Sequence, residues 1–189
     1  MSRNNTLGES MQILIVHGWN SDSKDNWFPW LKSELESRGM NVQCPDMPNP
    51  KFPKQEEWLE KLTAVVDNDN PLILVGHSLG TIAVLRLLER ISSKIVCVIL
   101  VAGFTQGFGV NAISDFFKTP FDFARIKQKS RKFIVISSSN DPYLPITEGQ
   151  KLADELNAEF IIEKNAGHLD SESGFSKYPS LLKLILELD

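Results

Sequence analysis

The chain has 189 residues, 42% of them apolar and 23% charged, which is the composition of an ordinary globular protein and excludes a disordered or fibrous chain. Its formal net charge is −4, whereas a protein that works mainly by neutralising phosphates normally carries a clustered basic excess. Nucleic acid is therefore not an expected partner.

The start of the sequence and its apolar runs bear on domain organisation and location. Residues 1–10, MSRNNTLGES, are polar, so we expect a flexible N-terminal segment followed by a single domain over residues 11–189. This start has no apolar signal-peptide region, and no run approaches the ~20 apolar residues of a membrane span. Cys44 and Cys97 stand in short apolar runs without CxxC spacing, and we expect both to be buried thiols. We therefore expect a cytoplasmic protein that does not act at a membrane.

Short β-branched runs alternate with segments of helical periodicity along the whole chain. We expect strands at Gln12–Val16, Val42–Cys44, Leu72–Val75, Ile95–Val101, Phe133–Ser137 and Glu159–Ile162. We expect helices around Trp27–Leu35 and Trp58–Val65, and at Ser78–Ile91, Phe123–Lys129, Thr147–Leu156 and Pro179–Leu188. This alternation predicts an α/β fold with three layers, in which helices cover both faces of a mainly parallel six-stranded sheet.

A GxSxG pattern, Gly76-His77-Ser78-Leu79-Gly80, directly follows the expected strand LILV and opens the helical run TIAVLRLLERI. At such a tight strand-to-helix turn the serine has a strained backbone and an exposed hydroxyl, and the flanking glycines permit close approach of neighbouring elements. The helix also directs its free N–H groups at developing negative charge. We therefore interpret Ser78 as a nucleophile; the alternative is that it only caps the helix.

A serine nucleophile requires a base, and the sequence has three histidines. His77 adjoins Ser78 in the turn, where its side chain must point away, and His17 ends the first strand in a glycine turn. His168 is left as the base, in the loop NAGHLD after the last expected strand, where catalytic groups collect in open α/β folds. The alternative is a surface loop histidine.

The acid that orients this base is expected between the serine and the histidine, at the end of another strand. Asp141 meets both conditions, because it follows the run FIVISSSN. Asp115, Asp122 and Asp154 also lie in this interval, but in or beside helical segments. The alternative for Asp141 is a simple turn residue before a proline.

An oxyanion hole needs two backbone donors. The N–H of Trp19, in the turn His17-Gly18-Trp19 after the first strand, is expected to act with the N–H of Leu79, the residue after the nucleophile. Gly18 keeps this backbone open to a substrate, and the Trp19 indole is free to pack on the sheet edge.

The order Ser78, Asp141, His168, with the HG turn upstream, resembles the α/β-hydrolase superfamily, and the finer pattern is similar to the retinoblastoma-binding-protein-9-like serine hydrolases. The resemblance rests on HGWNSDSKDNWFPWL, PDMPNP, the tryptophan of EEWLEKL, GHSLGTIAVLR, LVAGF, SSNDPYLP and GHLDSESGF. It implies an α/β-hydrolase fold without a large cap domain and a triad of these three residues. Leu169 departs from the pattern, since an aromatic residue often follows the histidine.

The segment between Val101 and Phe133, where larger relatives insert a cap, is short and rich in phenylalanine. It is expected to form either an apolar wall over the acyl group of a substrate or the aromatic packing of a crossover helix. The residues expected to line the substrate site are Phe104, Phe116, Phe117 and Leu144.

The leading hypothesis is hydrolysis of a small carboxylic ester, or of a thioester or amide, through an acyl-serine intermediate. The alternatives are acyl transfer to an acceptor other than water, and a protein-binding module that keeps the fold with little turnover. A partner would then bind the proline-rich loop from Cys44 to Lys54 or the phenylalanine-rich segment. No metal is expected, because the histidines lack HxH or HExxH spacing, and no cofactor is expected either.

Overall fold

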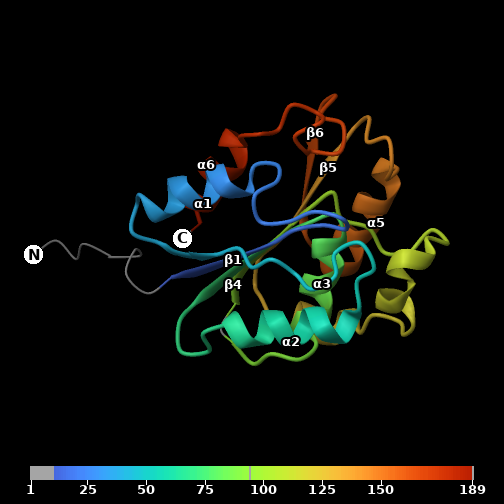
Figure 1. Ribbon diagram of the computed structural model, residues 1–189, viewed down its shortest axis with the longest axis horizontal. Coiled ribbons are helices and arrows are strands. Elements are labelled where there is room, and N and C mark those ends of the chain that lie inside the picture. Colours follow the sequence, from blue (N-terminus) through green and yellow to red (C-terminus); the bar gives the residue numbers. More distant parts are fainter. Residues whose placement is uncertain (1–10, 94, 189) are drawn as a thin grey trace, which may run out of the picture.

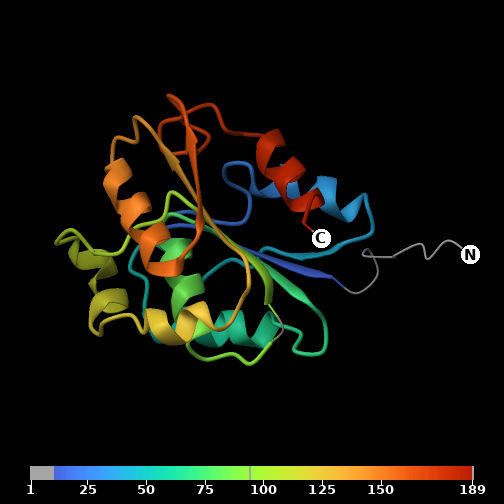
Figure 2. The same cartoon turned by 180° about the vertical axis from the view of Figure 1, so that it is seen from behind.

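The computed structural model describes residues 11–93 and 95–188, and its six strands form one parallel sheet (Figures 1 and 2). The segment 1–10, which we expected to be flexible, lies outside the described residues. The strands lie in the order β2-β1-β3-β4-β5-β6, and every neighbouring pair is parallel. They are β1 (Gln12–Val16), β2 (Asn41–Gln43), β3 (Leu72–His77), β4 (Ile95–Val101), β5 (Phe133–Ser138) and β6 (Glu159–Glu163).

Helices cover both faces of this sheet, which gives the three-layer α/β fold that the sequence predicts, with no large cap. They are α1 (Phe28–Glu36), α2 (Gln55–Val65), α3 (Leu79–Leu88), α4 (Phe123–Lys127), α5 (Ile146–Leu156) and α6 (Pro179–Leu186), with the 3-10 helix η1 at Asn111–Phe117. Figure 1 shows α1 and α6 on one face and α2, α3 and α5 on the other. In the described residues no helix has both the length and the apolar character needed to cross a bilayer.

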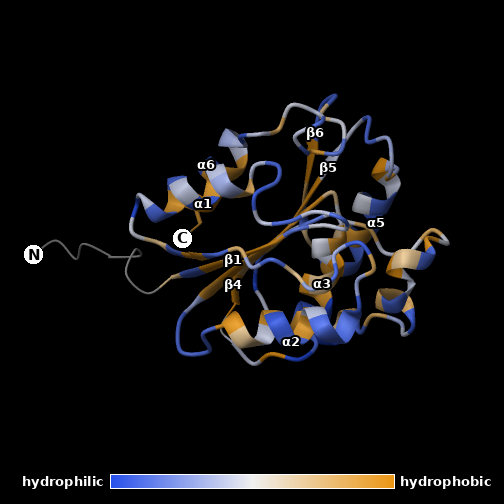
Figure 3. Ribbon diagram, viewed as in Figure 1, coloured by the Kyte–Doolittle hydropathy of each residue, from blue (hydrophilic) through white to orange (hydrophobic). Residues whose placement is uncertain are grey.

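The central strands are apolar on both faces because both faces are covered, as is usual for parallel sheets. In β1, Leu14 and Val16 belong to the core under α2, α3 and α5, whereas Ile13 and Ile15 belong to the core under α1 and α6. Figure 3 shows the strands coloured as hydrophobic between the helix layers. The alternation of side chains along each strand therefore builds two cores from one sheet.

The crevice for a functional site arises between β1 and β3. The chain leaves β1 through α1 toward β2, and it leaves β3 through α3 toward β4 on the opposite side and the opposite face. The loops after these two adjacent strands therefore diverge at their carboxyl ends. Such a switch point is where open α/β sheets bind ligands.

Two expectations about local structure need correction. The helix that we expected to start at Ser78 starts at Leu79, because β3 continues to His77. Cys44 is only half-buried and lies beyond β2, an edge strand whose pairing with β1 stops at Gln43. Cys97 is buried in β4 as expected, and burial raises the pKa of both thiols to about 12.

Candidate active site

Ser78 stands in the turn between β3 and α3 with φ 52° and ψ −122°, a conformation that non-glycine residues rarely adopt. Hydrogen bonds hold this strained residue from both sides. Its N–H donates to the carbonyl of Val101 at 2.9 Å, and its carbonyl accepts from the N–H and the hydroxyl of Thr81 at 2.9 and 2.7 Å. The turn therefore presents the half-exposed Ser78 side chain to the cavity above it.

Glycines let three backbone segments meet at this turn. A Cβ at Gly76 would lie 2.7 Å from the carbonyl oxygen of Gly80, and a Cβ at Gly80 would overlap the carbonyl oxygen of Val16. A Cβ at Gly18 would lie 3.1 Å from the Cβ of Ser78. The GxSxG pattern and the upstream glycine thus allow α3, β3 and the loop after β1 to pack backbone against backbone.

Asp141 and His168 are brought together from the loops after β5 and β6. His168 Nδ1 lies 2.7 Å from Asp141 Oδ2, and the two side chains are 11% and 3% exposed. The second carboxylate oxygen accepts the N–H groups of Tyr143 and Leu144 at 2.8 and 3.1 Å. With its proton on Nδ1, His168 keeps Nε2 as an acceptor, and no described residue hydrogen-bonds to it; a general base needs such an unprotonated nitrogen.

The other three aspartates between Ser78 and His168 form local hydrogen bonds or ion pairs. Asp115 accepts from the N–H of Gln55 and pairs with Lys118, while Asp122 caps α4 and Asp154 accepts from Gln150. None of these three carboxylates has a hydrogen bond to His168 in the described part of the chain. The geometry therefore favours Asp141 as the partner of His168.

His77 supports the backbone of His168 from below. It points to the face of β3 that also carries Val75, against Trp27 and Phe28, so it does turn away from Ser78 as expected. The His168 loop covers that same face, and His77 Nε2 lies 3.0 Å from the carbonyl oxygen of His168. Burial, together with the nearby His168 ring, lowers the pKa of His77 to about 4, so His77 is neutral and donates this bond from Nε2.

His17 fixes the peptide that carries the N–H of Trp19. Its Nε2 accepts from the N–H of Met47 at 2.9 Å, so its Nδ1 carries the proton and donates to the Gly18 carbonyl at 2.9 Å. Because that carbonyl and the Trp19 N–H belong to one planar peptide, the bond also sets the direction of the N–H. Burial lowers the pKa of His17, which favours the neutral ring. The sequence indicates only a turn residue at His17, and its position beside Gly18 is the one local sign of this role.

Trp19 and Leu79 both line the cavity, as expected for the two oxyanion donors. The N–H of Leu79 is in the first turn of α3, where N–H groups have no intrahelical acceptor. Trp19 is 44% exposed, and its indole Nε1–H donates to the Lys51 carbonyl at 3.0 Å. The geometry is thus compatible with the oxyanion role that we predict for both N–H groups.

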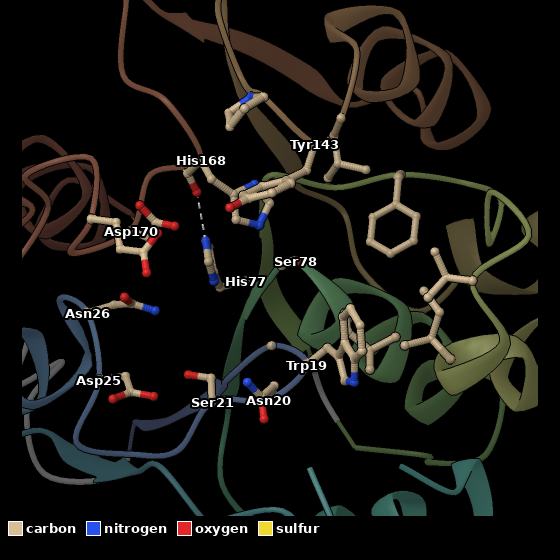
Figure 4. Close-up of a pocket in the computed structure, with 18 of the residues that line it drawn as sticks. Trp19, Asn20, Ser21, Asp25, Asn26, His77, Ser78, Tyr143, His168 and Asp170 are labelled. Atoms are coloured by element: carbon tan, nitrogen blue, oxygen red, sulfur yellow. Dashed lines mark hydrogen bonds between the residues drawn. The ribbon is translucent and has the colours of Figure 1, made fainter. Parts of the chain in front are cut away.

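A cavity of about 800 Å³ lies over Ser78 and includes His168 in its wall (Figure 4). Of the four residues expected to line it, Phe104 and Leu144 do so. Its other apolar lining residues include Val110, Ile113, Phe108 and Tyr143.

The expectation is wrong for Phe116 and Phe117, neither of which lines the cavity. η1 packs on α3, and Phe116 fills the space beneath it, fully buried with its ring centroid 5.5 Å from that of Trp58. Phe117 stacks behind Phe104, with ring centroids 5.8 Å apart. Part of the phenylalanine-rich segment therefore lines the cavity and part of it is core, and its role toward an acyl group stays a prediction.

Glu148 anchors this wall to α5, a role that the sequence analysis missed. Its buried carboxylate accepts from the N–H and the hydroxyl of Thr105 at 3.1 and 2.8 Å and from Gln106 Nε2 at 2.6 Å. These two residues directly follow Phe104, so the carboxylate holds the backbone that carries the apolar wall.

Known proteins similar to this chain cover nearly all of it. The family model described as Serine hydrolase matches residues 13–187. The YdeN protein of Bacillus subtilis (strain 168) is 32% identical over 172 residues, which are 89% of this chain and 90% of YdeN. The serine hydrolase RBBP9 of Rattus norvegicus is 28% identical over 162 residues, 84% of this chain and 86% of RBBP9. The crystal structure of the ydeN gene product superposes with a TM-score of 0.87 at 30% identity, over 95% of this chain and 98% of that chain.

Proposed function

This chain belongs to the serine hydrolase family, and from that membership we propose that it cleaves a small carboxylic ester through an acyl-serine intermediate on Ser78. His168 Nε2 takes the proton of the Ser78 hydroxyl as the oxygen attacks the ester carbonyl, and Asp141 holds the imidazole in the required tautomer. The proton then passes to the leaving alcohol. A water molecule, activated by the same nitrogen, hydrolyses the acyl-serine and restores the free hydroxyl.

The observation that carries this proposal is the 2.7 Å hydrogen bond between the buried side chain of Asp141 and His168, which lines the same cavity as the strained Ser78. A serine hydroxyl is a poor nucleophile without a base, and a base needs an orienting group. A serine, a histidine and an aspartate from three loops far apart in sequence lie close together here, and these are the side chains that such a mechanism needs.

Negative charge on the substrate carbonyl would be stabilised by the N–H groups of Trp19 and Leu79. A single donor of this kind typically contributes about 3 kcal/mol to transition-state stabilisation. The peptide orientation set by His17 supports this assignment because it fixes the direction of the Trp19 N–H before substrate binds.

An ester is favoured over a peptide because the cavity is compact and apolar on the side of Phe104 and Leu144. A thioester, an amide, or acyl transfer to another acceptor would use the same residues. A binding module without turnover would not need Ser78 at all, which gives a clear test.

Replacing Ser78→Ala should lower kcat for p-nitrophenyl butyrate by about 10⁴-fold or more, since the nucleophile is removed. The fold should be unchanged in circular dichroism, because the hydroxyl has no packing role. Ser33→Ala, at an exposed position of α1 outside the cavity lining, is the matched control and should keep its activity. Wild-type turnover in a clean Ser78→Ala preparation, or no turnover in the wild type, would contradict the proposal.

A further inference from the structure

The two sides of the cavity differ in chemistry. Figure 4 shows Ser21, Asp25, Asn26 and Asp170 gathered on one side of Ser78. The apolar lining residues are Phe104, Val110, Ile113 and Leu144. We call the first group, together with Glu172, the polar side and the second group the apolar wall.

The polar side carries a local excess of negative charge. Asp25, Asp170 and Glu172 line it, and Lys51 is the single cationic side chain among the described lining residues. None of the three carboxylates has an ion pair with a lysine or arginine in the described part of the chain. Although burial opposes ionisation, hydrogen bonds from Ser173 lower the pKa of Asp170, so its carboxylate is charged at neutral pH.

Two buried polar atoms at the same cavity have no hydrogen-bond partner among the described residues: the Ser21 hydroxyl and His77 Nδ1. The His77 side chain is 3% exposed, and its Nε2 donates to the His168 carbonyl, so Nδ1 on the other side of the ring is an acceptor. A buried acceptor without a partner costs about 1–3 kcal/mol. A ligand that brings hydrogen-bond donors to this side would recover part of that cost.

The reaction geometry decides which part of a substrate meets the polar side. His168 must pass its proton to the leaving alcohol, so the alcohol lies on the His168 side of the carbonyl. Asp170 and Glu172 follow His168 in the same loop, and Asn26 ties this loop to the loop after β1 by accepting the N–H of Ser171 at 2.9 Å. The acyl group then extends toward the apolar wall.

The carboxylates of Asp25, Asp170 and Glu172 lie at separate positions along the polar side. In the described residues no three acidic, histidine or cysteine side chains are arranged to ligate one metal ion. A spread of carboxylates with buried acceptors suits an organic cation that carries a donor. Net negative potential in a cleft also raises the local concentration of cationic ligands.

We propose that the polar side is a leaving-group subsite and that the preferred substrates are short-chain esters of protonated amino alcohols. This inference rests on the proposed function of Ser78. In the first step the Ser78 oxygen bonds to the carbonyl carbon, and the bond to the alcohol oxygen breaks as His168 protonates it. Water then hydrolyses the acyl-serine, so that one ester and one water give one carboxylic acid and one amino alcohol.

Two matched esters test the subsite: 2-(dimethylamino)ethyl butyrate, which is protonated at pH 7, and its neutral isostere 3-methylbutyl butyrate. The ratio of their kcat/KM values, divided by the ratio of their hydroxide-catalysed rates, measures the preference of the protein for the cation. We expect the wild type to prefer the cation by about tenfold or more. The preference should fall with rising ionic strength, because salt screens exposed charges.

Asp170→Asn and Asp25→Asn should each lower this preference severalfold, mainly through KM for the cationic ester. Glu155→Gln, an exposed residue of α5 outside the cavity lining, removes the same unit of charge and should leave the preference unchanged. Hydrolysis of both esters with no preference, or with a preference that survives in both aspartate variants, would overturn the subsite and leave the proposed function intact. If the protein hydrolyses neither of these two esters nor p-nitrophenyl butyrate, both the subsite and the proposed function are overturned.

Discussion

The three histidines of the chain show how the environment assigns different tasks to one side-chain type. His17 and His77 are buried, burial lowers the pKa of each, and each ring donates a hydrogen bond to a backbone carbonyl. His168 Nδ1 instead pairs with the carboxylate of Asp141. His17 and His77 thus hold the loops that carry Trp19 and His168, and the proton transfer that we propose falls to His168.

Asp141→Asn should slow acylation by roughly 10⁴-fold with little change in substrate binding, because an amide favours the wrong imidazole tautomer. Single-turnover kinetics with p-nitrophenyl butyrate separates the two effects. Asp115→Asn is the matched control, since Asp115 bonds to Gln55 and Lys118 and has no hydrogen bond to His168. If Asp115→Asn loses activity while Asp141→Asn keeps it, Asp141 is not the residue that orients His168.

The sequence predicts the candidate catalytic residues better than it predicts the residues that hold them in position. The order of Ser78, Asp141 and His168 and their position after strands indicate where they lie. The hydrogen bond from His77 to His168 joins residues 91 positions apart, and the bond between His17 and Met47 spans 30 positions. No local pattern encodes such contacts, because they depend on how loops from different strands fold over one another.

At the element scale, the runs of apolar residues predict the strands because both faces of a parallel sheet are buried. Errors fall at the ends of elements, as at Cys44, and in the segment between β4 and β5. There phenylalanines serve both the cavity and the core, and composition alone does not separate Phe104 from Phe116. The orientation of helix η1 determines which residues line the cavity and which are core: Ile113 lines the cavity, whereas Phe116 packs under the helix against Trp58.

The apolar wall is expected to set the acyl length that the protein accepts. Each methylene that a wall buries is worth about 0.8 kcal/mol, so kcat/KM for p-nitrophenyl esters rises only while the wall continues. We expect an optimum at about two to six carbons. Leu144→Ala should shift the optimum to longer chains, whereas Leu186→Ala, an exposed leucine of α6, should not. An optimum at twelve carbons or more in the wild type would mean that the cavity continues as a deep acyl tunnel.

At the scale of the whole molecule, the parallel sheet and its switch point explain why residues from both ends of the chain meet. The loop after β1 and the loop after β6 lie next to each other at the cavity, joined by the hydrogen bond between Asn26 and Ser171. The candidate site therefore forms only when the sheet and its loops have folded. Because burial lowers the pKa of the histidines beneath the site, we expect the free energy of unfolding to depend on pH.

The free energy of unfolding should fall as the pH is lowered from 7 to 5. In the unfolded chain a histidine binds its proton near pH 6.5, but His77 in the folded protein stays neutral down to about pH 4. Between these values the unfolded state binds more protons, so acidification favours it, by about 2 kcal/mol for His77 at pH 5. Urea denaturation at both pH values measures the loss. His77→Gln should show a smaller loss, and an equal loss in both proteins would contradict this role of His77.

Labelling by a fluorophosphonate probe, with the modified residue identified by mass spectrometry, tests whether Ser78 is an activated nucleophile. We predict that the wild type is labelled at Ser78 alone, that Asp141→Asn is labelled far more slowly, and that Ser78→Ala is not labelled. A folded wild-type protein that resists the probe, or a label on any residue other than Ser78, would mean that Ser78 is not the activated nucleophile.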